Sequence, residues 1–151
     1  MPDNETPTDH PDLARWKDQY YSYTRLMSFR ISSGADFSPA CTDDEPIPEV
    51  IQVAKALGGI AHIMLLSGRS DEVRSQTLDW LDELSIPCTA LYMREHGDHR
   101  EDSVVKGEMI DDLRKQWPNE HIMGIFEDRK QVVDMYRAKG LRVFQVAEGN
   151  F

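Results

Sequence analysis

Three groups of polar residues stand beside apolar runs of the sequence, at points where buried strands are expected to end. Ser67-Gly68-Arg69 follows Ile63–Leu66, and Glu127-Asp128 follows Ile122–Phe126. Lys106 lies near the start of a predicted helix. A hydroxyl group and backbone N–H groups hold phosphate oxygens, a lysine neutralises them, and carboxylates are ligands of Mg²⁺. Together these residue types favour a Mg²⁺-dependent phosphoryl-transfer site.

Each group also has an ordinary structural interpretation. Ser67 and Asp128 each precede a predicted helix, so either side chain could be a helix N-cap, and Asp102 could cap the predicted helix that contains Lys106. Lys106 could extend its ammonium group to solvent. A lysine near the positive end of a helix opposes the usual preference for acids there, and a phosphate or the Glu127-Asp128 pair would neutralise it. For each residue taken alone, both interpretations stay open.

The segment Arg94–Arg100 mixes basic, acidic and histidine side chains. Its two terminal arginines, Arg94 and Arg100, could hold phosphate as part of a substrate-binding loop. His96 and His99 raise the question of zinc, but no third and fourth ligand follow at a regular spacing. The composition therefore favours a phosphate loop over a zinc site.

From residue 46 onward, strands and helices alternate. Helices are expected over 46–57, 70–84, 102–117 and 131–139, and strands over 61–66, 89–93, 122–126 and 141–146. Before this region, residues 13–19 suggest a short helix and residues 20–27 have the aromatic and β-branched bias of a strand. The alternation predicts an α/β, Rossmann-like parallel sheet with helices on both faces. Ligands bind at the carboxyl ends of such strands, where all three polar groups fall.

The length and composition of the chain limit which classes of protein it can belong to. A chain of 151 residues forms one domain, and a net charge of −10 argues against a broad basic surface that coats nucleic acid. Cys41 and Cys88 are far apart in the sequence and are expected to be reduced thiols. No apolar run reaches the length of a membrane span, so we expect a soluble, cytoplasmic protein with no membrane partner. Residues 1–12 are predicted to be a disordered lead-in to a domain over 13–151.

The segment from Asp43 to Phe151 resembles the 3′-phosphatase domain of bacteriophage-type polynucleotide kinase, a member of the haloacid dehalogenase (HAD) superfamily. The resemblance covers about 110 of the 151 residues. The matching stretches are DDEPIPEVI, LLSGRSDEVRSQTLDWL, MREHGDHREDSVVKGEM, FEDRKQVVDMYRAKG and QVAEGNF. It implies a HAD-like fold with little or no cap, and an open site that admits a large substrate such as a nucleic-acid end.

The resemblance also implies roles for the polar groups. Ser67 matches the family's phosphate-binding hydroxyl group, with Gly68 and Arg69 beside it. Lys106 matches the lysine that neutralises the phosphate and the nucleophile. Glu127-Asp128 matches the acidic pair that completes the Mg²⁺ site, although the family usually has two aspartates there.

The first motif of the family is missing. HAD phosphatases have a strand that ends in Asp-x-Asp-x-Thr, whose first aspartate is the nucleophile and whose second is the general acid–base. No Asp-x-Asp occurs in this sequence, and the best positional match is Tyr21–Leu26. A phenol with a pKa near ~10 is neutral at physiological pH and a poor Mg²⁺ ligand. Asp18, Asp36 or an upstream segment would have to supply the carboxylate.

Three hypotheses follow. The resemblance implies a phosphatase that acts on phosphomonoesters such as nucleic-acid 3′-phosphate ends. The alternative is a catalytically inactive pseudophosphatase that binds phosphate or a protein partner, because the nucleophile motif is absent. The third is that the first 45 residues are not native, through a shifted reading frame or a misassigned start, because the resemblance is much better after residue 43.

Overall fold

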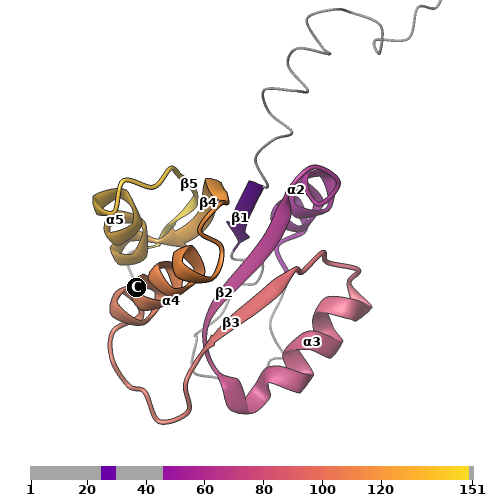
Figure 1. Ribbon diagram of the computed structural model, residues 1–151. Helices are drawn as coiled ribbons and strands as arrows, with labels where there is room; N and C mark the ends of the chain where they lie inside the picture. Colours follow the sequence, from indigo (N-terminus) through magenta and orange to yellow (C-terminus); the bar gives the residue numbers. More distant parts are fainter. Residues whose placement is uncertain (1–24, 30–45, 150–151) are drawn as a thin grey trace, which may run out of the picture.

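The computed structural model describes residues 25–29 and 46–149 of the chain. It contains a sheet of five parallel strands in the order β3-β2-β1-β4-β5 (Figure 1). The strands are β1 (Arg25–Phe29), β2 (His62–Ser70), β3 (Ala90–Arg94), β4 (His121–Arg129) and β5 (Val143–Gly149). The parallel sheet predicted from the alternation of strands and helices is therefore confirmed.

The helices also lie close to their predicted ranges. They are α2 (Pro48–Leu57), the short 3₁₀ helix η3 (Asp71–Val73), α3 (Arg74–Glu83), α4 (Asp102–Gln116) and α5 (Lys130–Ala138). Gly58 caps α2, and Gly140 after α5 has a φ of 78°, a left-handed conformation that favours glycine at a helix end. None of the described helices combines the length and apolarity needed to cross a membrane.

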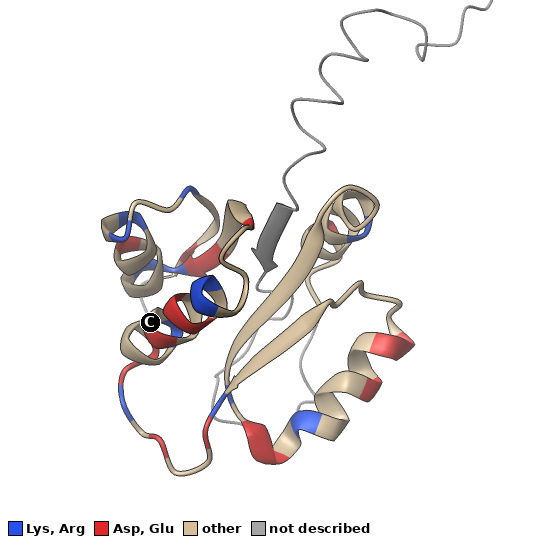
Figure 2. Cartoon of the chain, viewed as in Figure 1, with Lys and Arg blue, Asp and Glu red and all other residues tan. Residues whose placement is uncertain are grey.

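Helices cover both faces of the sheet. Along β2, Ile63 and Leu65 pack with α2 and α3, whereas Met64 and Leu66 pack with α4 and α5. This alternation follows from the period of two in a strand, and it makes β2 buried on both faces. Charged residues lie on the helices, on the loops and at strand ends, while most of β2 and β3 is uncharged (Figure 2).

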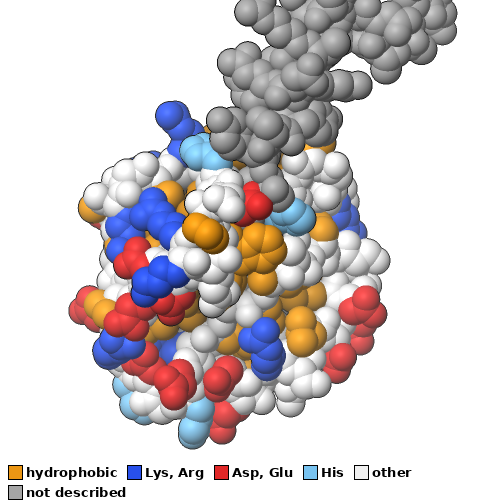
Figure 3. Space-filling model, in the orientation of Figure 1, with side chains coloured by type: hydrophobic (Ala, Val, Ile, Leu, Met, Phe, Trp, Pro, Cys, Tyr) orange, Lys and Arg blue, Asp and Glu red, His pale blue; other side chains and the backbone are white. Residues whose placement is uncertain are grey.

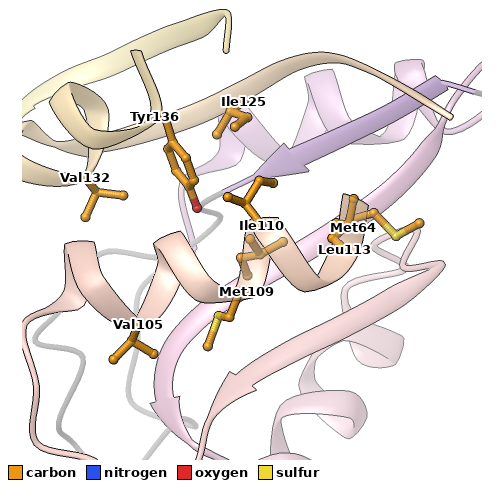
Figure 4. Close-up of a cluster of buried hydrophobic side chains, with 9 residues drawn as sticks. Met64, Val105, Met109, Ile110, Leu113, Ile125, Val132 and Tyr136 are labelled. Atoms are coloured by element: carbon orange, nitrogen blue, oxygen red, sulfur yellow. The ribbon is translucent and has the colours of Figure 1, made fainter. Parts of the chain in front are cut away.

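The core beneath α4 and α5 supports the polar groups at the strand ends. In Figure 4, Ile110 and Leu113 of α4 lie beside Met64 of β2, while Tyr136 of α5 points toward α4 and Ile125 of β4. These five side chains are each at most 1% exposed. Burying one such side chain contributes about 1.5–3 kcal/mol, so this cluster fixes the position of α4 against the ends of β2 and β4.

Strand β1 occupies the centre of the sheet and pairs with β2 and β4. It overlaps the predicted strand over 20–27 only in part. The positional match to the first motif, Tyr21–Leu26, is wrong for this strand, because Arg25 and Leu26 begin β1 whereas the family's motif lies at the carboxyl end of its strand. Residues 21–24 lie outside the described residues, as do the predicted lead-in and the expected helix over 13–19.

We expect Gly149→Ala to destabilise the protein. A Cβ atom at this position would lie 2.5 Å from the backbone oxygen of Asp128, a contact that no side-chain rotation relieves. The free energy of unfolding, measured by urea denaturation, should fall by about 1–3 kcal/mol. Gly107→Ala in α4 is the control: its Cβ would meet only side-chain atoms at 3.5 Å or more, and stability should rise by about 0.5–1 kcal/mol. Equal effects of the two substitutions would contradict this account of Gly149.

Candidate functional site

The polar groups meet at the carboxyl edge of the sheet, which is the edge where the parallel strands end. β2 and β4 flank the central strand β1. The chain adds β2 and β3 on one side of β1 and then β4 and β5 on the other, and α/β sheets bind ligands at such a switch point in strand order. Both flanking strands run further than predicted, so Ser67–Arg69 and Glu127-Asp128 lie in their last residues. Each segment has an irregular register with its neighbour, as is common beside functional sites.

Lys106 is buried in α4 and is 1% exposed. Its Nζ lies 2.9 Å from Oε2 of Glu127 and 3.2 Å from Oδ2 of Asp102. The alternative in which Lys106 extends to solvent is therefore wrong. Two carboxylates compensate a cation that lies near the positive end of its helix.

Glu127 is held by the protein at both oxygens. Its Oε2 accepts a hydrogen bond from Lys106, and its Oε1 accepts from the backbone N–H groups of Asp128 and Arg129 at 3.0 and 3.2 Å. Burial raises the pKa of Glu127, but the charge of Lys106 and these hydrogen bonds outweigh burial and lower that pKa to about 2. Glu127 is therefore ionised at neutral pH and forms a buried ion pair.

Asp102 has a different role from the one expected. The sequence suggests that it caps α4, but Glu101 is the N-cap residue and Asp102 is the first residue of the helix. The Asp102 side chain is 1% exposed, with Oδ1 3.3 Å from a guanidinium nitrogen of Arg94 and Oδ2 3.3 Å from one of Arg129. Its spacing of four residues from Lys106 was the available signal, because such pairs share a helix face.

Arg94 joins the end of β2 to the start of α4. It donates from Nε to the Gly68 carbonyl at 2.7 Å, from one terminal nitrogen to the Arg100 carbonyl at 2.7 Å, and from the other to Asp102. The residue is 3% exposed. Its role in substrate binding stays a prediction, and this geometry favours a supporting role.

These contacts connect the three sequence groups. They run without interruption from Gly68 through Arg94, Asp102 and Lys106 to Glu127. We call these five residues the buried network. The structure thus places the Ser67–Arg69 segment, the lysine and the acid pair in a single site.

The Ser67–Arg69 segment is folded back on itself at the end of β2. The Oγ atom of Ser67 accepts a hydrogen bond from the Arg69 N–H at 3.2 Å. Ser67 does not cap the next helix, because the N-cap of η3 is Ser70, whose side chain accepts from the Glu72 N–H. Arg69 is 7% exposed, so its side chain is buried rather than on the outer surface.

The other predicted residues lie on the exposed loop between β3 and α4. Arg100 pairs with Asp98 and with Glu108, at 2.7 Å in each case. The hydrogen bonds from Arg100 lower the pKa of Asp98. His96 contacts Glu72 at 2.7 Å. Within residues 25–29 and 46–149, no group of three or more His, Cys, Asp or Glu side chains is placed to hold a metal, so the zinc hypothesis gains no support.

The two acids of the pair differ in how well they could serve as Mg²⁺ ligands. Carboxylate oxygens suit this ion, which takes one or two of them and completes its shell with water and phosphate. Glu127 is committed to Lys106 and to two backbone N–H groups. Asp128 is therefore the better candidate for a metal ligand, with Glu127 behind it as the residue that orients Lys106.

Comparison with known proteins assigns the chain to a family. A model of the polynucleotide kinase PNKP phosphatase domain matches residues 35–151. The chain belongs to this family. As a PNKP phosphatase domain it has the HAD-like, Rossmann-like fold that the resemblance implied, with the Ser67–Arg69 segment, Lys106 and the acid pair on the strands and helix described above.

Two solved structures of similar proteins agree with this family assignment. A chain from a structure of the Pnkp1/Rnl/Hen1 RNA repair complex is 28% identical, with a TM-score of 0.72 over 85% of this PNKP phosphatase domain. A chain from another structure of the Pnkp1/Rnl/Hen1 complex is also 28% identical, with a TM-score of 0.74 over 86%. The match covers 43% and 48% of those chains, so this chain spans less than half of either relative.

We expect Lys106→Met to destabilise the protein because it leaves the buried Glu127 carboxylate without the cation that pairs with it, and removes one of the three cations beside Asp102. Breaking a buried ion pair lowers the free energy of unfolding by about 3–5 kcal/mol at neutral pH. Lys115→Met is the control, since Lys115 forms an exposed pair with Asp112 and surface pairs contribute about 0–1 kcal/mol.

The pH dependence of stability tests the same Lys106–Glu127 pair, because the pairing predicts the direction of the change. In the parent protein the folded-state pKa of Glu127 lies near 2, below its ordinary 4.5, so its stabilising contribution is present above pH 4.5 and is lost as the pH falls toward 2. In Lys106→Met, burial without the cation raises this pKa. The difference in stability between parent and variant, from urea denaturation, should therefore shrink on acidification. Parallel stability curves for the two proteins would contradict the pairing.

Proposed function

We propose that this domain binds the phosphate of a phosphomonoester, such as the 3′-phosphate end of a nucleic acid, at the carboxyl edge of its sheet. The observation that carries the proposal is the buried network, which holds Lys106 between the Ser67–Arg69 segment and the acid pair. Stability alone does not account for it, because buried ion pairs are often no more stabilising than apolar residues of similar size. A shifted pKa and a buried charge partner, as Glu127 has, favour a functional role at a sheet edge where ligands bind.

The roles of the residues follow from their chemistry. The Ser67 hydroxyl, the Gly68 backbone and the Arg69 guanidinium group bind phosphate oxygens, because hydroxyl, amide and guanidinium groups are all donors. Lys106 supplies positive charge from the opposite side. The nucleic-acid assignment is supported by a solved relative, which is a chain of the Pnkp1/Rnl/Hen1 RNA repair complex.

We include Mg²⁺ in this proposal. Asp128 would be its protein ligand, together with phosphate oxygens and water. When bound, the ion would offset the negative charge of the phosphate and polarise its oxygens. Glu127 keeps Lys106 in position beside it.

We propose further that the bound phosphate is not hydrolysed, so that the domain acts as a pseudophosphatase. The carboxyl end of β1 is Phe29, and the residues that follow it in the sequence are Arg30, Ile31 and Ser32. In the register of the sheet Phe29 pairs with Phe126, which directly precedes Glu127. Arg30 and Ser32, a basic residue and a hydroxyl residue, therefore stand where the family's two aspartates are expected. Loss of a nucleophile removes nearly all of the covalent pathway.

A second candidate is a working 3′-phosphatase. The buried network and Asp128 support it, because the residues that we propose to bind phosphate and metal are otherwise in place. This candidate requires a carboxylate from elsewhere in the protein, with Asp36 as the first acid after β1 in the sequence and Asp18 before it.

Calorimetry with two oligonucleotides tests the binding proposal. We expect an oligonucleotide with a 3′-phosphate to bind at least ten-fold more tightly than the same strand with a 3′-hydroxyl, and more tightly with Mg²⁺ than without. Arg69→Gln should remove most of this difference, whereas Lys115→Gln, an exposed lysine on α4, should leave it unchanged. Equal affinity of the parent protein for the two strands would refute phosphate recognition.

Hydrolysis of p-nitrophenyl phosphate separates the two candidates. We expect no turnover by the parent protein. Arg30→Asp combined with Ser32→Asp creates Asp-x-Asp directly after β1 and should confer Mg²⁺-dependent turnover that Asp128→Asn removes. Tyr21→Asp with Tyr23→Asp is the matched control and should confer none, because these residues precede β1. Turnover by the parent that disappears in Asp128→Asn would instead establish the phosphatase.

A further inference from the structure

A second hollow lies at the amino edge of the sheet, where β4 and β5 begin. It is a groove of about 570 Å³ bordered by the starts of these two strands and by the ends of α4 and α5. His121, the first residue of β4, lines it. Glu127 lies six residue steps after His121 along β4, which corresponds to about 20 Å. The amino-edge groove is therefore a separate place from the phosphate site described above.

Three arginines from three different elements line the groove. Arg114 belongs to the last turn of α4, Arg137 to the last turn of α5, and Arg142 directly precedes β5. All three are exposed. Figure 3 shows Lys and Arg side chains gathered on the side of the molecule where α5 and β5 lie, with hydrophobic side chains among them.

These arginines differ from most other Lys and Arg side chains that the structure describes. None of the three forms an ion pair with a carboxylate of the described residues, although Arg114 donates to the Lys139 carbonyl at 3.5 Å. Nearby surface lysines do have carboxylate partners: Lys115 pairs with Asp112 and Lys139 with Asp111. The helix dipoles favour a cation at the ends of α4 and α5, but they do not account for Arg142.

The groove offers more than positive charge. Glu120 lines it, and the Oε2 atom of Glu120 is enclosed without a hydrogen-bond partner among the residues that the structure describes. An enclosed carboxylate oxygen is costly unless a donor reaches it. Ile122 and Leu141 supply apolar wall. A ligand for this groove therefore has negative charge for the arginines, a hydrogen-bond donor for Glu120 and an apolar surface.

We propose that the amino-edge groove binds a nucleotide. The phosphate would meet the guanidinium groups, which hold phosphate through planar, paired N–H donors. A ribose hydroxyl or a base amino group would donate to Glu120, and the base would pack on the apolar wall. The volume lies within the range of about 300–1,000 Å³ that is usual for small-molecule sites. This proposal does not rest on the function proposed for the carboxyl edge.

Two probes test it on the full chain: adenosine 5′-monophosphate, and a fluorescent eight-nucleotide RNA with hydroxyl groups at both ends. We expect at least one to bind with saturation. Binding of the mononucleotide identifies a free nucleotide as the ligand, and RNA binding that the mononucleotide does not displace identifies a nucleotide within a strand. Arg137→Ala with Arg142→Ala should weaken binding at least ten-fold.

The matched control removes the same charge elsewhere. Lys115→Ala with Lys130→Ala also deletes two cations, which lie outside the groove and pair with Asp112 and Asp134. Binding by this variant should stay within two-fold of the parent. Equal weakening by both double variants would show general electrostatic attraction and overturn the proposal. So would failure of both probes to bind the parent, or displacement of the RNA by an acidic peptide of equal charge at equal concentration.

Glu120→Ala separates nucleotide recognition from simple anion binding. Removal of this carboxylate should weaken binding of adenosine 5′-monophosphate, because the donor of the ribose or base loses its acceptor. The same change should leave binding of inorganic phosphate unchanged or strengthen it, since a negative charge beside the arginines is gone. If both ligands bound the variant more tightly than the parent, the groove would be an anion site without nucleotide specificity.

Discussion

The buried ion pair between Lys106 and Glu127 is the interaction on which the carboxyl edge depends. An isolated ammonium group in the core is very unfavourable, so α4 can bury Lys106 only where carboxylates lie against it. Glu127 at the end of β4 and Asp102 on α4 itself provide them. This requirement fixes the first turns of α4 over the strand ends, and Arg94 then attaches the end of β2 to the same group.

Much of this arrangement could be predicted from the sequence. The apolar runs and helical spacings fixed the strands and helices after residue 46 to within a few residues, because most of them bury continuous hydrophobic surface. Recognition of Ser67 and the acid pair needed only their positions after predicted strands, and recognition of Lys106 needed only its position near the start of a predicted helix. The resemblance to a known family then joined them into one site.

What could not be predicted depends on contacts between distant residues. The extension of β2 and β4 through polar residues follows from pairing with neighbouring strands, which local composition does not encode. Asp102 resembles an ordinary helix cap until Arg94, Lys106 and Arg129 are seen around it. Strand β1 has the mixed composition RLMSF, and its central position comes from parallel pairing on both sides.

We propose that the carboxyl edge is a preassembled phosphate receptor, in which Glu127 and Asp102 hold the Lys106 ammonium group in place before any ligand arrives. A crystal structure of the full chain with Mg²⁺ and a short 3′-phosphorylated oligonucleotide tests this claim most directly. The account predicts the terminal phosphate between the Ser67–Arg69 segment and Lys106, with the Lys106–Glu127 contact retained near its 2.9 Å. A phosphate bound elsewhere, or a Lys106 side chain turned away from Glu127, would contradict it.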